Sequence, residues 1–166
     1  MTLEDTSSGE KIEAVIEPMT ADDFKTVRKD KVRFDSFNWN KYKNQGVYKL
    51  RLTADEIILG VMCLVDHPGD GMNAIEIELL EVAADHRRGK KKLANIAGCL
   101  IAFACREAFR RGYEGWVFLI PKTYLLEHYP SKYGFTYIPL KSQDRPEGFM
   151  ELNTSSSLRL IKKYLD

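Results

Sequence analysis

Residues 75–109 read IEIELLEVAADHRRGKKKLANIAGCLIAFACREAF, and this stretch decides the fold. Residues 75–82 are rich in residues that favour a strand and begin by alternating isoleucine with glutamate. Residues 93–109 are too long and too rich in alanine for a strand, and they are apolar almost all round. The stretch therefore predicts a strand, a basic loop and a long, mostly buried helix, in which Gly98 is expected to allow close packing on a sheet.

Six further stretches have the apolar pattern of strands: residues 12–16, 47–53, 57–65, 116–120, 135–138 and 149–152. Shorter helices are expected after the capping pair Thr20 and Asp23, over 123–133 and over 158–165. Residues 32–45 are aromatic and polar and form either a short helix or a structured loop. This order predicts an α/β fold of mixed α+β type, with a central, mixed, mostly antiparallel sheet of about seven strands flanked by helices.

The composition is that of one folded domain. The chain has 166 residues, of which 44% are hydrophobic and 30% charged, which excludes a disordered chain, a collagen-like fibre and a disulfide scaffold. We expect residues 1–10 to form a flexible tail and residues 11–166 to form a single domain. The net charge of +1, from 25 Lys and Arg against 24 Asp and Glu, disfavours nucleic acid as a partner.

The sequence favours a cytoplasmic protein without a membrane span or a metal. The first ten residues are acidic and polar, unlike a secretion signal, and the longest apolar stretches fall short of the ~20 residues that cross a bilayer. The three cysteines lack C-x-x-C spacing, which is typical of reduced core thiols. The histidines lack the i, i+4 spacing of a metal site, and His67 is expected to be a loop residue.

The strongest local signal is the basic run from Arg87 to Lys92, which lies between the predicted strand and the predicted buried helix. A helix N-terminus presents unpaired backbone N–H groups and the positive end of the helix dipole, and both attract phosphate oxygens. The arginine and lysine side chains add full positive charge. In this context the run predicts a phosphate site, whereas elsewhere such a run is more often a solvated surface or a nonspecific polyanion patch.

These features together resemble the GNAT superfamily of N-acetyltransferases. The likeness lies in Leu80-Glu81-Val82, in the basic run that opens a long helix, and in residues 129–135, which end in Tyr-Gly-Phe before a strand. In that family a strand splays from its neighbour, acyl-CoA lies in the gap, and the motif Arg/Gln-x-x-Gly-x-Gly/Ala surrounds the pyrophosphate. The resemblance implies a GNAT-like acyl-CoA N-acyltransferase fold with acetyl-CoA as co-substrate.

Two registers of the pyrophosphate motif are open. Starting it at Arg87 puts Lys90 and Lys92 where the family has glycine or alanine, and starting it at Arg88 puts Lys91 and Leu93 there. Glycine permits close backbone approach to a phosphate, whereas lysine adds a Cβ and a charge. Thr123 takes a position where the family often has an asparagine near the pantetheine arm. The predicted cofactor-binding residues are Leu80, Val82, Arg87, Arg88, Gly89, Lys90, Lys91, Lys92, Leu93 and Thr123.

Direct acetyl transfer to an amine needs a base, donors for the oxyanion and an acid for the departing thiolate. Glu76 lies where some members of the GNAT superfamily carry the base. Strand alternation predicts that Glu76, Glu78 and Leu80 share one face of the strand. Ile75, Ile77 and Leu79 are expected on the opposite face. A backbone N–H near Leu80 to Val82 is expected to hold the oxyanion. The family's acid tyrosine falls at Pro130, so the adjacent Tyr129 is the candidate. The alternative is that Glu76 and Glu78 lie on a solvated strand face without a catalytic role, and that Tyr129 is a structural residue.

We therefore expect an acyl-CoA-dependent N-acetyltransferase that moves an acetyl group from acetyl-CoA to a primary amine by direct attack. The alternative is a catalytically weak or inactive module of the same fold that binds CoA or another protein, which the missing glycines and the displaced tyrosine favour. A third hypothesis, a nucleic-acid contact through the basic run, is disfavoured by the near-neutral remainder of the chain. The amine-bearing acceptor, small molecule or protein, and the oligomeric state, a homodimer included, stay open.

Overall fold

The computed structural model describes residues 1–69, 71–87, 89, 92–121, 132–143 and 148–166. Nine strands lie within these ranges: β1 (Thr2–Asp5), β2 (Lys11–Pro18), β3 (Gly46–Leu52), β4 (Ile58–His67), β5 (Ala74–Val82), β6 (Leu93–Ala94), β7 (Val117–Leu119), β8 (Thr136–Ile138) and β9 (Phe149–Leu152). The helices there are α1 (Ala21–Lys29), α2 (Ile96–Arg110) and α4 (Thr154–Tyr164), with 3₁₀ turns η1 (Trp39–Tyr42) and η2 (Ala84–His86). None of these helices is long and apolar enough to span a membrane.

The strands form one sheet in the order β6-β1-β2-β3-β4-β5-β7-β9-β8, in which β5 and β7 are parallel and the other neighbours antiparallel. The predicted mixed, mostly antiparallel sheet with flanking helices is confirmed, although the sheet has nine strands rather than seven. The two additional strands, β1 and β6, pair with each other. The expected flexible tail over residues 1–10 is wrong at residues 2–5, because β1 also pairs with β2 and Leu3 is fully buried.

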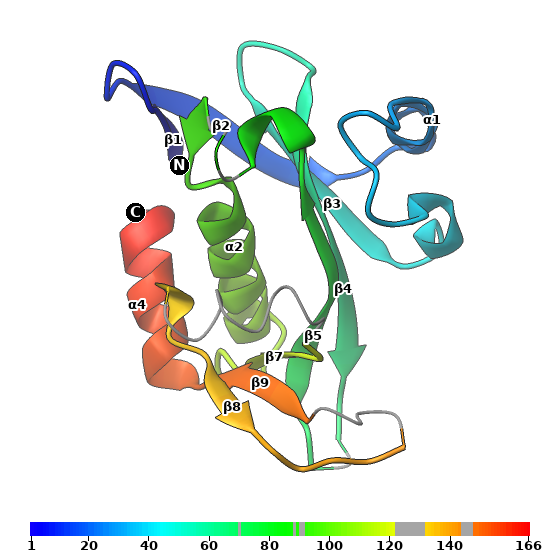
Figure 1. The fold of residues 1–166 in the computed structure, drawn as a ribbon. Helices are drawn as coiled ribbons and strands as arrows, with labels where there is room; N and C mark the ends of the chain where they lie inside the picture. Colours follow the sequence, from blue (N-terminus) through cyan, green and yellow to red (C-terminus); the bar gives the residue numbers. More distant parts are fainter. Residues whose placement is uncertain (70, 88, 90–91, 122–131, 144–147) are drawn as a thin grey trace.

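Different helices cover the two faces of the sheet (Figure 1). α2 and α4 lie side by side on one face, here called the α2 face, over a hydrophobic cluster that includes Leu100, Ile101 and Leu160. α1 and η1 cover part of the other face, here called the α1 face, through a cluster that includes Phe24 and Trp39. The strand residues of the second cluster come from β3, β4 and β5, and none of its described members comes from β7 or β9. α1 and η1 therefore cover the α1 face over β3, β4 and β5, and they do not extend over β7 and β9.

Hydrogen bonds at the N-cap residues of α1 and α4, and strand pairing before α2, determine where these helices begin. In α1 the predicted pair is confirmed, since the Thr20 hydroxyl accepts from the Asp23 N–H and the Asp23 carboxylate accepts from the Thr20 N–H. α2 begins at Ile96 rather than at residue 93, because Leu93 and Ala94 pair with β1 instead. α4 begins at Thr154, four residues before its predicted start, because the Asn153 side chain accepts from the Ser156 N–H.

A bulge in β5 changes which residues share a face. Cys63 on β4 pairs with Leu79 and Leu64 pairs with Ile77, so Glu78 has no register partner on β4. The side-chain alternation therefore shifts by one residue after Ile77. Leu80 joins Ile77 in the cluster on the α2 face, and Leu79 joins the cluster on the α1 face. The expected faces of Leu79 and Leu80 are wrong for this reason, since uninterrupted alternation cannot show an inserted residue.

β5 and β7 are paired over only part of their length. The register joins Ile75 to Val117 and Glu76 to Phe118, and the Ile75 N–H also donates to the Trp116 carbonyl at 3.1 Å. β5 continues six residues beyond Glu76, to Val82, without another described strand on that edge. A strand that separates from its neighbour at this point is what the resemblance implies.

Glycines on both sides of α2 allow close packing. A Cβ at Gly60 on β4 would lie 2.9 Å from side-chain atoms of Ile96 and Leu100, so this glycine lets α2 approach the sheet. A Cβ at Gly98 would instead overlap the ring of Tyr164 on α4. The expected partner of Gly98, the sheet, is therefore wrong, and the partner is the second helix of the α2 face.

Gly98→Ala is expected to destabilise the protein. Overpacking costs about 1–3 kcal/mol, and the direct overlap with the Tyr164 ring places the cost in the upper part of that range, above the roughly 1 kcal/mol that alanine gains over glycine within a helix. Urea denaturation should therefore show a lower free energy of unfolding. In a Tyr164→Leu background, where the ring is absent, the same substitution should be neutral or stabilising. An equal loss in both backgrounds would show that the Tyr164 contact is not the cause.

Candidate functional site

Glu76 and His67 form a hydrogen-bonded pair beside the point where β5 and β7 separate. The His67 Nε2 lies 2.8 Å from the Glu76 Oε1, and the Glu76 side chain is about nine-tenths buried. The His67 ring also packs on Phe118, with ring centroids 5.1 Å apart. The expectation that His67 is a loop residue is wrong, because β4 extends through it. Sequence analysis missed this pair because the register between β4 and β5 brings the two residues together, and the sequence does not show that register.

Glu78, the other candidate base, occupies the bulge on the α1 face. Together with Glu76 it helps to raise the pKa of the Cys63 thiol to about 12, although burial is the larger cause. Glu78 also contributes to the raised pKa of the Tyr42 hydroxyl, again after burial. Both carboxylates therefore lie near Cys63, but only Glu76 adjoins β7 in the register. Cys63, Cys99 and Cys105 are all free and buried, as predicted.

Beyond Glu76, one edge of β5 carries backbone groups that pair with no described strand. The Ala83 N–H donates to the Leu59 carbonyl on β4 at 2.9 Å. Because hydrogen-bonding direction alternates along an antiparallel strand, Leu80 and Val82 direct their backbone groups to the opposite edge. The Val82 carbonyl there accepts from the Arg87 Nε at 2.7 Å. The Leu80 side chain is buried on the α2 face, so its backbone is the part available to a ligand.

Arg87 is held by partners on the α1 face. Besides the Val82 carbonyl, its guanidinium donates to the carboxylates of Asp35 at 2.9 Å and Glu81 at 2.7 Å. Hydrogen bonding to Arg87 is the largest cause of the lowered pKa of the Asp35 carboxyl. Arg87 is predicted to bind pyrophosphate, and the structure shows its charge already engaged by two carboxylates at the start of the loop.

Glu81 is the buried centre of this cluster. Its side chain is only 2% exposed, and it accepts from the Trp39 indole N–H at 2.8 Å and the Ser36 N–H at 2.9 Å in addition to Arg87. Trp39 itself belongs to the core of the α1 face. Arg87 and Glu81 thereby connect the start of the basic loop to residues 35–39, which precede η1 and include its first residue. The sequence showed Glu81 only as one more charged strand residue.

The rest of the loop leads from β5 to the start of α2. Gly89 is exposed with φ of 86°, a conformation that favours glycine. The Lys92 carbonyl accepts from the Thr6 N–H at 3.0 Å, and the Lys92 side chain is exposed. The Leu93 N–H donates to the His86 Nδ1 at 3.3 Å, and burial, the largest cause, lowers the pKa of His86 and so favours the neutral, accepting ring.

The N-cap residue of α2, Asn95, does not cap the helix with its side chain. Asn95 has φ of 79° and makes no capping hydrogen bond, so the first N–H groups of α2 are not occupied by that side chain. Five predicted site residues lie outside the described residues: Arg88, Lys90, Lys91, Thr123 and Tyr129. Among the residues that are described, no group of three or more His, Cys, Asp or Glu has the arrangement to hold a metal ion.

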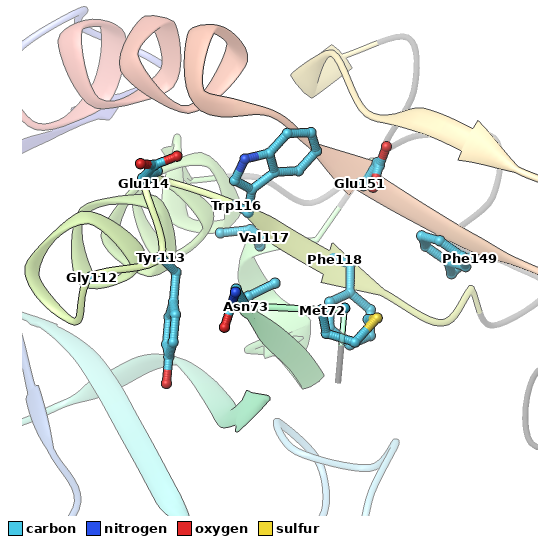
Figure 2. Close-up of a pocket in the computed structure, with 12 residues that line it drawn as sticks. Met72, Asn73, Gly112, Tyr113, Glu114, Trp116, Val117, Phe118, Phe149 and Glu151 are labelled. Carbon is cyan, nitrogen blue, oxygen red and sulfur yellow. The ribbon is translucent and has the colours of Figure 1, made fainter. Parts of the chain in front are cut away.

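A pocket of about 580 Å³ lies at the N-terminal ends of β5 and β7 (Figure 2). The basic loop follows the other end of β5, after Val82. The pocket is lined by residues 71–74, 112–114, 116–118, 149 and 151. Phe118, which pairs with Glu76, is part of its wall, so the pocket adjoins the Glu76–His67 pair. The sequence did not predict this pocket, because its wall comes from three segments that are distant along the chain, namely residues 71–74, 112–118 and 149–151.

Comparison with known proteins identifies the fold. No protein-family model and no curated protein matches the sequence. Among solved structures, a chimera of the spermidine N-acetyltransferase SpeG from Vibrio cholerae and hSSAT is 15% identical with a TM-score of 0.60, covering 88% of this chain and 98% of that one. A GNAT-family acetyltransferase from Listeria monocytogenes is 15% identical with a TM-score of 0.56, covering 91% and 97%. AtaTR, solved with acetyl-CoA bound, is 16% identical with a TM-score of 0.59, covering 90% and 98%. The chain therefore has the GNAT acetyltransferase fold, as the resemblance in the sequence implied.

Arg87→Gln should destabilise the protein because it leaves the buried Glu81 carboxylate without its cation. Removing one partner of a buried ion pair costs about 3 kcal/mol, and the one-third exposure of Arg87 places the expected loss at about 2–3 kcal/mol. Urea denaturation measures it. The matched control is Arg110→Gln, since Arg110 pairs with Glu107 but is 68% exposed, and it should change stability by less than about 0.5 kcal/mol. Equal losses in the two variants would contradict a special role of the Glu81 pair.

Proposed function

We propose that the protein is an acetyl-CoA-dependent N-acetyltransferase that acts on a primary amine. The observation that carries the proposal is the separation of β5 from β7 after Glu76, which leaves backbone groups of Leu80 and Val82 directed into a gap. The uncapped start of α2 and the exposed Gly89 and Lys92 support a phosphate site at the end of that gap. The bound acetyl-CoA of AtaTR, a protein of similar fold, is consistent with this co-substrate.

The chemistry requires the amine to lose a proton and attack the thioester carbonyl carbon. A carbon–nitrogen bond forms, the carbon–sulfur bond breaks, and the thiolate leaves and takes up a proton. In the proposal Glu76 accepts the amine proton, and the His67 hydrogen bond holds the Glu76 carboxylate in place. A backbone N–H of Leu80 or Val82 stabilises the oxyanion. Tyr129 stays the predicted acid, outside the described residues.

Calorimetry with acetyl-CoA tests the binding step. We expect micromolar affinity for the native chain, and an at least tenfold weaker affinity after Lys90→Gln, Lys91→Gln and Lys92→Gln together, because three charges near the phosphates are lost. The matched control replaces the exposed Lys25, Lys162 and Lys163 by glutamine and should bind like the native chain. No binding of acetyl-CoA or CoA at millimolar concentration would contradict the proposal and favour a protein-interaction module.

Glu76→Gln tests the assignment of the base. Loss of general-base catalysis typically costs a factor of 10² to 10⁴, so we expect kcat to fall about 100-fold while the calorimetric affinity for acetyl-CoA is retained. Glu78→Gln is the matched control on the same strand, and its effect on kcat should be below tenfold because Glu78 does not adjoin β7 in the register. The rates are measured from release of the free thiol. A larger effect at Glu78 than at Glu76 would reverse the assignment.

A further inference from the structure

One row of residues crosses β5, β7 and β9 on the α1 face, starting at the candidate base. The register pairs Glu76 with Phe118, and it pairs Phe118 with Glu151. Directly paired residues place their side chains on the same face of a sheet. Adjacent strands are about 4.8 Å apart, so the Cα atoms of Glu76 and Glu151 are about 10 Å apart. The two carboxylates therefore flank one buried aromatic ring, that of Phe118.

Glu151 is a half-buried carboxylate to which the described residues offer no hydrogen bond or ion pair. Burial raises the pKa of its carboxyl group, and no hydrogen bond or charge in the described part of the chain offsets that effect. By contrast, Glu76 has His67 and Glu81 has Arg87. A partly buried carboxylate without compensation is an unfavourable feature in the free protein. A cation beside it would remove that cost.

The pocket around Glu151 has the character of a cation site with an apolar floor (Figure 2). Its described lining contains two carboxylates, Glu114 and Glu151, and no lysine, arginine or histidine. Phe118 and Phe149 pack together with their ring centroids 6.1 Å apart, and Met72 and Trp116 pack against them. Aromatic faces add to the attraction of a positive charge. Such a surface suits a charged end group that is joined to an alkyl chain, whereas the two carboxylates would repel an anionic group.

We propose that this pocket binds a second cationic group of the acceptor, and that the acceptor is an alkyl diamine whose chain lies over Phe118 between Glu76 and Glu151. This inference rests on the proposed function, because Glu76 marks the end at which the amine reacts. In this assignment Glu151 determines specificity and makes no contact with the reacting atoms. The roughly 10 Å between the two carboxylate-bearing positions sets the length of the favoured chain.

Acetylation of 1,8-diaminooctane and octylamine by the full chain tests the proposal. The two compounds have the same alkyl length and differ in the second amine. We expect the native protein to favour the diamine at least tenfold in kcat/KM. Glu151→Gln should lower this preference about tenfold, because a charge-assisted hydrogen bond to the distal ammonium is lost. The matched control is Glu13→Gln, which removes the charge of an exposed glutamate on β2 and should retain the native preference.

A second measurement separates this inference from the proposed function. Calorimetric titration of 1,8-diaminooctane without acetyl-CoA should show binding to the native protein that Glu151→Gln weakens about tenfold, while thermal denaturation shows the variant to be folded. That result supports the pocket even if no amine is acetylated. Equal acetylation of the diamine and octylamine, or a preference that Glu151→Gln leaves unchanged, overturns the assignment of Glu151 and leaves the acetyltransferase proposal intact.

Discussion

The short parallel pairing between β5 and β7 is the constraint on which the rest of the site depends. It joins Ile75 to Val117 and Glu76 to Phe118, and beyond these pairs β5 continues without another described strand on that edge. A β-strand edge left unpaired exposes N–H and C=O groups that a ligand can satisfy. The bulge at Glu78 lies just past the last pair, where it bends the strand and strengthens its twist. The proposed gap for acetyl-CoA is thus a consequence of backbone geometry.

Arg87, the first charged residue of the basic loop, also has a structural role. Arg87 bridges Glu81, Asp35 and the Val82 carbonyl, and Glu81 in turn accepts from the Trp39 indole. These bonds connect the loop before α2 to the segment that enters η1 on the opposite face. The bonds to Asp35 and Glu81 are charge-assisted, which makes them stronger than hydrogen bonds between neutral groups. Counting positive residues overstates the charge that the loop can offer to a phosphate, because one arginine is already paired.

The two faces of the sheet differ in the groups that they carry. The loop that follows β5 leads to the uncapped N-terminus of α2 on one face, and the α1 face carries Glu76, Phe118 and Glu151 in a row across three strands. A co-substrate held along the β5 edge and an acceptor held on the α1 face would meet near Glu76. The proposals for acetyl-CoA and for a dicationic amine are therefore compatible in space, since they use separate surfaces that share one carboxylate.

The sequence by itself determined the order and type of most elements, the buried character of α2 and the position of the basic loop, because apolar periodicity and capping pairs such as Thr20 and Asp23 are local signals. It missed β1, which pairs with β2 and β6, and the two-residue strand β6, because both are short and are defined by pairing with distant segments. It also misassigned the faces of Leu79 and Leu80, because alternation does not reveal the bulge. Only the tertiary structure joined His67 to Glu76, engaged Arg87 with Glu81, and aligned Glu151 with Phe118. These contacts are set by strand register and by the pairing of distant segments, and neither is encoded in the spacing of residues along the chain.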